Sequence, residues 1–263
     1  MIRREDKKIL KKYLTKLTPF DIINLSKERE EEIKMAKKKF IMVLDTETAN
    51  GMMINGKLDL SYSLVYDIGF TVIDKKGNIY CQGSLAIRDV FCGMRDVMKS
   101  AYYAKKIPKY WEDIKAGKRD LVSFMWARKI ILDTMKEYGI TTVAAHNASF
   151  DIRALNNTIR YITKSEKRYF FPYGTEIWDT LKGATNTICK QKGYIAFCEK
   201  NKYLTAHKIP KARATAEILY KYISGNYDFI EEHQGLSDTE IEARILVQIL
   251  KQHSKKEYIR LYA

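Results

Sequence analysis

The stretch "FIMVLDTETAN", residues 40–50, decides the fold, because five apolar residues run directly into acidic ones. A continuous apolar run of this kind is typical of a strand covered on both faces of a sheet. Asp45 and Glu47 end the run one residue apart, and burying unpaired carboxylates there is costly. The sequence therefore predicts a central strand whose end carries negative charge that another group must offset.

The rest of the chain predicts a mixed α/β domain. Three strands come first, as a meander, and helices then alternate with strands, which implies a mixed central sheet flanked by helices. Much of 83–120 fits no single pattern. Periodicity and turn residues predict strands at 40–45, 63–74, 79–87, 141–146 and 175–180, and helices at 120–139, 151–162, 212–223 and 238–253.

Composition narrows the class of protein. A chain of 263 residues with 46% hydrophobic content is long enough to bury one full core. The net charge of +15 favours a polyanionic partner, nucleic acid before membrane. No apolar run is long enough to cross a bilayer or to act as a secretory signal, so we expect a cytoplasmic protein without a membrane partner. Residues 1–38 are interpreted as a basic helical extension ahead of one domain at 39–263.

Acidic residues recur where the predicted elements begin or end. Asp151 opens a helix, and Ser237 with Glu240 forms the S-x-x-E pattern of a capping box, which would place Asp238 at the first helical position. A single acid at a helix start is usually explained by the helix dipole. Several acids at the strand and helix ends of one α/β sheet instead favour a site, because such ends meet at the same edge.

The chemistry of these acids predicts a site for hard cations. Oxygen ligands without sulfur suit Mg²⁺ or Mn²⁺, and two such ions can stabilise the attacking and leaving oxygens of a phosphodiester. His233 precedes Asp238 with four residues between them, and Gly235 permits a loop that turns the imidazole toward the same ions. A histidine in that position can take a proton from the attacking water.

Three segments together resemble the DEDD family of 3′-to-5′ exonucleases: "VLDTET" at 43–48, "AHNASFD" at 145–151 and "HQGLSD" at 233–238. The H-x4-D spacing is similar to that of the histidine-type branch, DEDDh, which includes the proofreading epsilon subunit of bacterial DNA polymerase III and RNase T. The tyrosine-type branch would need tyrosine where Gln234 stands. The resemblance covers about residues 39 to 253 and implies an RNase H-like fold with a five-stranded mixed sheet flanked by helices.

The resemblance also implies roles for individual residues. Asp67 and Asp179 match positions in the family's structural core. His233 would be the general base. The four ligands of two Mg²⁺ or Mn²⁺ ions would be Asp45, Glu47, Asp151 and Asp238, and the pocket around the terminal nucleotide would be shaped by Thr46, Thr48, His146, Asn147 and Phe150.

The leading hypothesis is a two-metal 3′-to-5′ exonuclease that releases nucleoside monophosphates from single-stranded or frayed DNA, in proofreading, repair or replication. A DNA polymerase or replication protein is then a candidate partner. An exoribonuclease of the RNase T or oligoribonuclease type would use the same residues. A catalytically silent nucleic-acid-binding module is the non-enzymatic alternative, and the presence of all five catalytic positions counts against it. The extension at 1–38 and the lysine-rich stretch at 190–213 leave substrate and partners open.

Overall fold

The computed structural model describes residues 38–49, 52–54, 57–59, 61–99, 101, 104–231, 233–252 and 259–261. From Phe40 onward the described chain forms one compact unit. The predicted helical extension lies outside the described residues, apart from its last residue, Lys38. Within the described part of the chain, no helix is long and apolar enough to cross a membrane.

Strands and helices alternate from β6 (Asp120–Val122) to α8 (Thr180–Asn186), and the named elements after α8 are helices. The strands are β1 (Phe40–Ala49), β2 (Met52–Ile54), β3 (Lys57–Asp59), β4 (Leu64–Asp74), β5 (Ile79–Ile87), β6 (Asp120–Val122), β7 (Thr142–Ala145) and β8 (Glu176–Asp179). The helices are α3 (Arg88–Phe91), α4 (Arg95–Lys99), η1 (Ala104–Lys106), α5 (Ile107–Lys115), α6 (Phe124–Glu137), α7 (Ala148–Ile162), α8 (Thr180–Asn186), η2 (Ile188–Lys190), α9 (Lys192–Lys200), α10 (Ala216–Ser224) and α11 (Gly235–Lys251).

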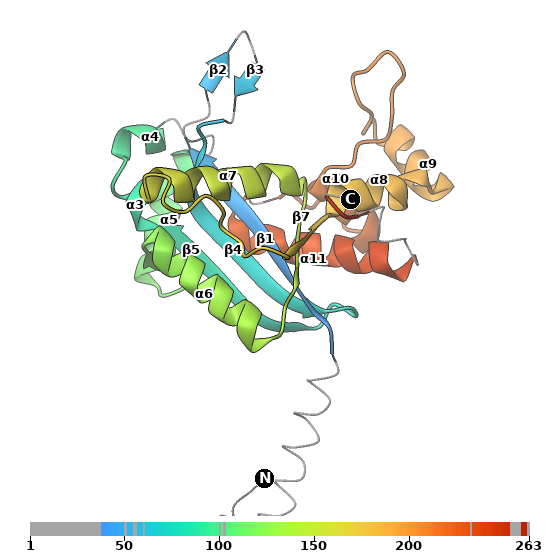
Figure 1. Cartoon of the computed structure of the whole chain (residues 1–263). Coiled ribbons are helices and arrows are strands. Elements are labelled where there is room, and N and C mark those ends of the chain that lie inside the picture. Colours follow the sequence, from blue (N-terminus) through green and yellow to red (C-terminus); the bar gives the residue numbers. More distant parts are fainter. Residues whose placement is uncertain are drawn as a thin grey trace, which may run out of the picture. The chain divides into compact units, whose positions relative to one another are not determined.

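One mixed sheet organises the described unit. Its strand order is β6-β5-β4-β1-β7-β8, while β2 and β3 pair with each other. β1 is antiparallel to β4 and parallel to β7. α11 packs against β1 and β4, and α6 and α7 lie on the opposite face of the sheet (Figure 1). The predicted mixed sheet flanked by helices is confirmed.

The sheet has a sixth strand where five were predicted. β6 pairs in parallel with the end of β5, at Leu85–Ile87. The helix predicted from residue 120 accordingly begins only at Phe124, after Ser123, whose hydroxyl accepts a hydrogen bond from the Trp126 N–H. Ser123 is a regular N-cap. A three-residue strand is too short to show periodicity, so the sequence pattern merged it with the helix that follows.

The end of β1 is open on one side, which creates room for a site. β7 pairs with β1 only at Met42 and Val43, and then the chain leaves β7 and turns into α7. On its other side, β1 follows β4 up to a register shift between Glu47 and Thr48. Bulges of this kind re-aim side chains and are common beside active sites. The acidic end of β1 therefore faces the first turns of two helices, α7 and α11.

Candidate active site

Nine of the ten residues predicted for the site line one cleft of about 870 Å³ at the end of β1. The cleft lies among β1, the start of α7, the start of α11 and the segment that precedes α10. Asp151 is the predicted residue that does not line it. Four segments that are distant in sequence are thus brought together by the sheet edge.

Three of the predicted ligands converge in this cleft. Asp45, Glu47 and Asp238 each offer a carboxylate oxygen, and these oxygens all lie within 4.8 Å of one another. Asp45 and Glu47 share one face of β1 because alternate strand residues point the same way. Asp238 meets them from the first turn of α11.

The oxygen set fits a hard divalent cation. Asp238 Oδ1 is buried, and among the described residues it has no hydrogen-bond partner. A buried carboxylate oxygen without a partner is unfavourable unless a cation or water satisfies it. Three carboxylates in one cluster match the ligand preference of Mg²⁺ or Mn²⁺. Asp45, Glu47 and Asp238 are therefore the residues that would hold such an ion.

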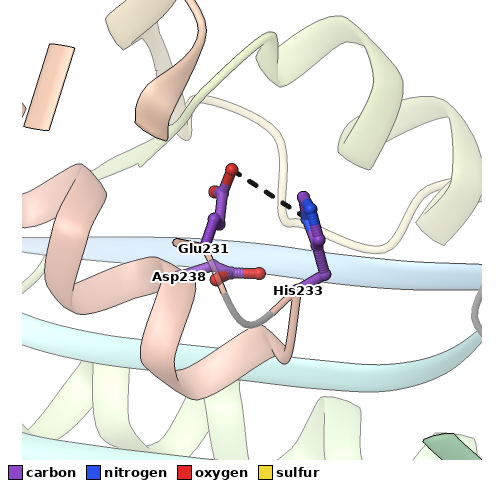
Figure 2. Close-up of side chains that lie close together, drawn as sticks. All are labelled: Glu231, His233 and Asp238. Atoms are coloured by element: carbon purple, nitrogen blue, oxygen red, sulfur yellow. Dashed lines mark ion pairs between the residues drawn. The ribbon is translucent and has the colours of Figure 1, made fainter. Parts of the chain in front are cut away.

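A second set of candidate ligand atoms shares Asp238. Glu231, His233 and Asp238 also place ligand atoms within 4.8 Å of one another. Figure 2 shows these three side chains gathered at the start of α11. Glu231 was not predicted as a site residue. Its Oε2 lies 3.9 Å from Nδ1 of His233, and it too lines the cleft.

Asp151 lies behind the cleft rather than in it. The residue is only 2% exposed, and its Oδ1 accepts hydrogen bonds from Thr46 N at 3.1 Å and from Thr46 Oγ1 at 2.8 Å. The Thr46 N–H reaches Asp151 because β7 no longer pairs with β1 at this point. Asp151 thus ties the first turn of α7 to β1, and its role as a metal ligand stays a prediction.

His146 shapes the cleft from behind. Nδ1 lies 2.9 Å from Thr180 Oγ1, Nε2 lies 2.8 Å from the Ala214 carbonyl oxygen, and the backbone N–H donates to Glu242 at 3.1 Å. Burial lowers the pKa of this imidazole. Both ring nitrogens are therefore committed to holding the end of β7 against α8 and the segment before α10.

The neighbouring Asn147 turns the chain into α7. Its backbone is left-handed, with φ of 67°, a conformation that asparagine tolerates better than most residues. Its N–H donates to Asp179 Oδ1 at 3.1 Å, and the same oxygen caps α8 through the N–H groups of Leu181 and Lys182. Asp179 thus has the structural role that was predicted for it.

The cleft concentrates carboxylates that resist ionisation. Burial raises the pKa of Glu47 to about 9, and nearby carboxylates add to the rise. Burial, followed by repulsion from Glu231, raises the pKa of Asp238 to about 8. Burial and acidic neighbours also raise the pKa values of Asp45 and Glu242. Divalent cations would offset this repulsion and favour the ionised forms.

His233 stands at the start of α11 in a strained backbone position. Its φ of 51° lies in the left-handed region, which is uncommon for residues other than glycine and often marks functional sites. Lys106 Nζ donates to the His233 carbonyl oxygen at 3.4 Å. Burial first, and then the Lys106 charge, lowers the pKa of the imidazole. The lowered pKa favours the neutral ring, which is the form that can accept a proton.

A buried ion pair contacts the start of α11, two residues after His233. Asp67 is fully buried opposite Glu47 in the β1–β4 register, and it binds the Arg119 guanidinium. Asp67 Oδ2 also accepts hydrogen bonds from Tyr110 Oη at 2.8 Å and from Gly235 N at 3.2 Å. Asp67 thus fixes the first residue of α11, in agreement with its predicted structural role.

The start of α11 differs from the sequence prediction. The helix begins at Gly235 with Gln234 as its N-cap, and Ser237 Oγ donates to the Gln234 carbonyl oxygen at 2.9 Å. The predicted capping box of Ser237 and Glu240 is therefore wrong. Tertiary contacts of Gly235 with β4 extend the helix by one turn, so Asp238 lies inside the first turn rather than at its first position.

Sequence reasoning also missed residues that line or flank the cleft. Glu242 could have been found, because it follows Asp238 by four residues and so shares its helix face. Glu231 and Lys106 carried no such signal, since their positions depend on how irregular segments pack. Arg213, which lines the cleft, belongs to a stretch where only the lysine content stood out.

Comparison with known proteins places the fold. No protein-family model and no curated protein matches the chain. A full-length 3′-exonuclease matches at 14% identity over 82% of this chain and 83% of the other, with a TM-score of 0.54. A structure of 3′-end specific recognition of a histone mRNA stem-loop by a 3′-exonuclease matches at 14% identity over 81% and 82%, with a TM-score of 0.51.

A third solved structure with the same fold comes from a named family. It is the nuclease domain of a DEDDh family member bound to rAMP, 14% identical over 82% of this chain and 94% of the other, with a TM-score of 0.50. The chain thus has the RNase H-like fold of the DEDDh exonucleases, and the predicted fold is confirmed. At 14% identity, this similarity establishes the fold alone, so any inference about activity depends on the residues of the cleft.

Proposed function

We propose that this chain is a metal-dependent 3′-to-5′ exonuclease that removes nucleoside monophosphates from single-stranded or frayed 3′ ends of DNA. One observation carries the proposal. Asp45, Glu47 and Asp238 place carboxylate oxygens within 4.8 Å of one another, and Oδ1 of Asp238 is buried without a partner among the described residues. His233 lines the same cleft, and a nitrogen of its ring lies near the carboxylate of Asp238. A binding module would have no need of this arrangement.

The residues of the cleft would have different roles in the hydrolysis of one phosphodiester bond. Two divalent ions, when bound, would stabilise the charge that develops on the attacking and leaving oxygens. His233 accepts a proton as the water oxygen bonds to phosphorus. The bond from phosphorus to the 3′ oxygen breaks, the terminal nucleotide leaves with a 5′ phosphate, and the shortened strand gains a 3′ hydroxyl. Thr48 and Phe150 line the cleft where the terminal sugar and base would lie.

A loop beside the cleft supplies positive charge for the strand. Residues 203–213, here called the basic hairpin, are joined by a bridge between Leu204 and Ala212 and by the hydrogen bond from Thr205 N to the Lys211 carbonyl oxygen at 2.8 Å. Thr205 and Arg213 line the cleft, and Lys208 is exposed at the tip. Phosphates 5′ of the scissile bond are the ligands that these cations fit.

RNA is the second candidate substrate. Two of the solved structures that share the fold contain RNA or an RNA nucleotide: a histone mRNA stem-loop in one and rAMP in the other. The carboxylates and His233 would perform the same chemistry on either sugar, so substrate choice requires a direct comparison.

The test uses 5′-labelled DNA and RNA of one sequence, incubated with the purified chain in Mg²⁺ or EDTA. We expect a ladder of products that shorten from the 3′ end in Mg²⁺ and no products in EDTA. The control is the double variant Asp45→Asn/Asp238→Asn, which should be inactive because it removes two of the converging charges. Shortening in EDTA, or by the double variant, would contradict the proposal. The ratio of the two rates identifies the preferred sugar.

A further inference from the structure

Glu231 is an acidic residue of the cleft for which the proposed reaction has no assigned role. It lies two residues before His233, and its side chain is 13% exposed. Its Oε2 faces Nδ1 of His233 at 3.9 Å, and Figure 2 shows the carboxylate turned toward the imidazole with Asp238 beside them. The carboxylate therefore faces Nδ1, which leaves Nε2 as the ring nitrogen that would take the proton of the attacking water.

Hydrogen bonds hold the backbone around His233, but these bonds do not fix the orientation of the imidazole ring. Lys106 contacts the His233 carbonyl, Arg119 contacts the Gln234 side chain at 3.4 Å, and Gly235 N donates to Asp67. These contacts fix the left-handed turn at His233. The direction and the tautomer of an imidazole are set by the partner of its other nitrogen.

We propose that Glu231 is a positioning residue that orients the His233 imidazole for proton transfer. This inference rests on the proposed function. A carboxylate facing Nδ1 favours the tautomer with its proton on Nδ1, so the lone pair is on Nε2. When Nε2 takes the proton of the attacking water, the same carboxylate stabilises the imidazolium. Serine-type triads use a carboxylate in this way.

A competing role for Glu231 is that of a direct cation ligand, since its oxygen is also near Asp238. The two roles predict different coupling. An orienting carboxylate acts only through His233, so its removal matters only while the imidazole is present. A cation ligand acts without His233 and changes the Mg²⁺ concentration that the reaction requires.

The experiment measures single-turnover cleavage of a saturating single strand across Mg²⁺ concentrations, with Glu231→Gln, His233→Ala and the double variant. We expect Glu231→Gln to slow cleavage about 10- to 100-fold, the loss typical of partners that orient a functional imidazole. The Mg²⁺ concentration for half-maximal rate should stay unchanged. In the His233→Ala background, Glu231→Gln should cause no further loss. Glu240→Gln, the same substitution at an exposed position of α11, is the control.

A second readout avoids activity. The chain has four histidines, so ¹⁵N shifts of the His233 ring can be assigned by comparison with His233→Ala. The Nδ1-protonated tautomer should dominate in the wild type without added metal, and both tautomers should appear in Glu231→Gln. Should that variant fail to fold, Glu231→Asp keeps the charge and should give an intermediate rate and tautomer ratio.

Three results would overturn the inference: an additive loss in the double variant, a raised Mg²⁺ requirement, or an active wild type with Glu231→Gln equal to it in rate and tautomer. The first two would make Glu231 a ligand. A wild type that does not shorten strands would instead defeat the proposed function, so the two failures are distinguishable.

Discussion

At the scale of single residues, Asp238 connects most of the site. Its carboxylate belongs to two groups of candidate ligand atoms that lie within 4.8 Å of one another. One group includes Asp45 and Glu47, and the other includes Glu231 and His233. Its Oδ1 is buried without a partner among the described residues. In a protein without bound cations such a group is destabilising when ionised, because it lacks both water and a counter-charge. The site therefore lowers the stability of the metal-free fold.

This cost predicts how stability depends on pH. The folded pKa values of Glu47 and Asp238, about 9 and about 8, lie above the usual value near 4 for these acids. The folded protein therefore binds more protons than the unfolded chain between these values, and its stability falls as pH rises. We expect the Tm in EDTA to fall from pH 7 to pH 9, and Mg²⁺ to raise the Tm more at pH 9 than at pH 7.

Thermal unfolding of wild type and Asp238→Asn checks this prediction. The variant should show a shallower fall in EDTA and a smaller gain from Mg²⁺, since one titrating ligand is gone. Asp133→Asn, which removes an exposed partner of Lys129, should behave like wild type. An equal Mg²⁺ gain at both pH values would show that the carboxylates do not bind the ion.

At the scale of elements, the backbones of β4 and of the start of α11 lie very close together. A Cβ at Gly69 would lie 2.0 Å from the Gly235 carbonyl carbon and 2.2 Å from Leu236 N. Such distances are impossible without moving backbone. Because Gly235 lies two residues after His233, the packing of Gly69 on Gly235 sets the position of this end of α11.

Gly69→Ala should therefore damage both stability and activity. Overpacking of this kind typically costs about 1–3 kcal/mol, and the displaced helix start would carry Asp238 and His233 away from β1. The control is Gly193→Ala in α9, where the Cβ would meet only the movable Tyr222 hydroxyl at 2.9 Å. Thermal unfolding and single-turnover cleavage measure both effects. A Gly69→Ala protein with wild-type Tm and rate would show that α11 need not sit so close.

The elements also show what sequence can and cannot predict. The apolar run of β1 and the helical periodicity of α11 were readable because each buries a continuous face over many residues. The candidate acids at their ends could be identified because motif spacing is local, and their catalytic role is part of the proposal. The short strand β6 and the true start of α11 were not, since each depends on a partner strand. Glu231 lines the cleft from an irregular segment, and Lys106 contacts His233 from the end of the short helix η1. The course of both segments is set by packing rather than by local preference.

At the scale of the whole molecule, the sequence has a net charge of +15, whereas the cleft is lined by several acidic residues. In the proposed reaction, the cations would bind phosphates along the strand and the acids would bind the metal ions at its end. The basic hairpin is the described segment that brings both together, because Arg213 lines the cleft and Lys208 and Lys211 are exposed beyond it.

Neutralising the hairpin should weaken binding without slowing chemistry. In the inactive Asp45→Asn/Asp238→Asn background, Lys208→Gln/Lys211→Gln should lower affinity for a single strand and reduce the slope of log affinity against log salt by about 1 to 2. In the active protein, the single-turnover rate at saturating strand should be unchanged. Lys129→Gln/Lys136→Gln on α6, outside the cleft, is the control. An unchanged salt slope would remove the hairpin from the substrate path.

Blocking the 3′ terminus of the strand tests whether the cleft binds one 3′-terminal nucleotide and whether the bond before that nucleotide is the one hydrolysed. Cleavage in Mg²⁺ is compared for a strand with a 3′ hydroxyl, the same strand with a 3′ phosphate, and a covalently closed single-stranded circle. This binding mode predicts stepwise shortening of the first strand and no cutting of the circle. It also predicts a rate at least about 10²-fold lower for the second strand, because added charge beside Glu47 displaces the end. Rapid degradation of the blocked strand or of the circle would contradict it.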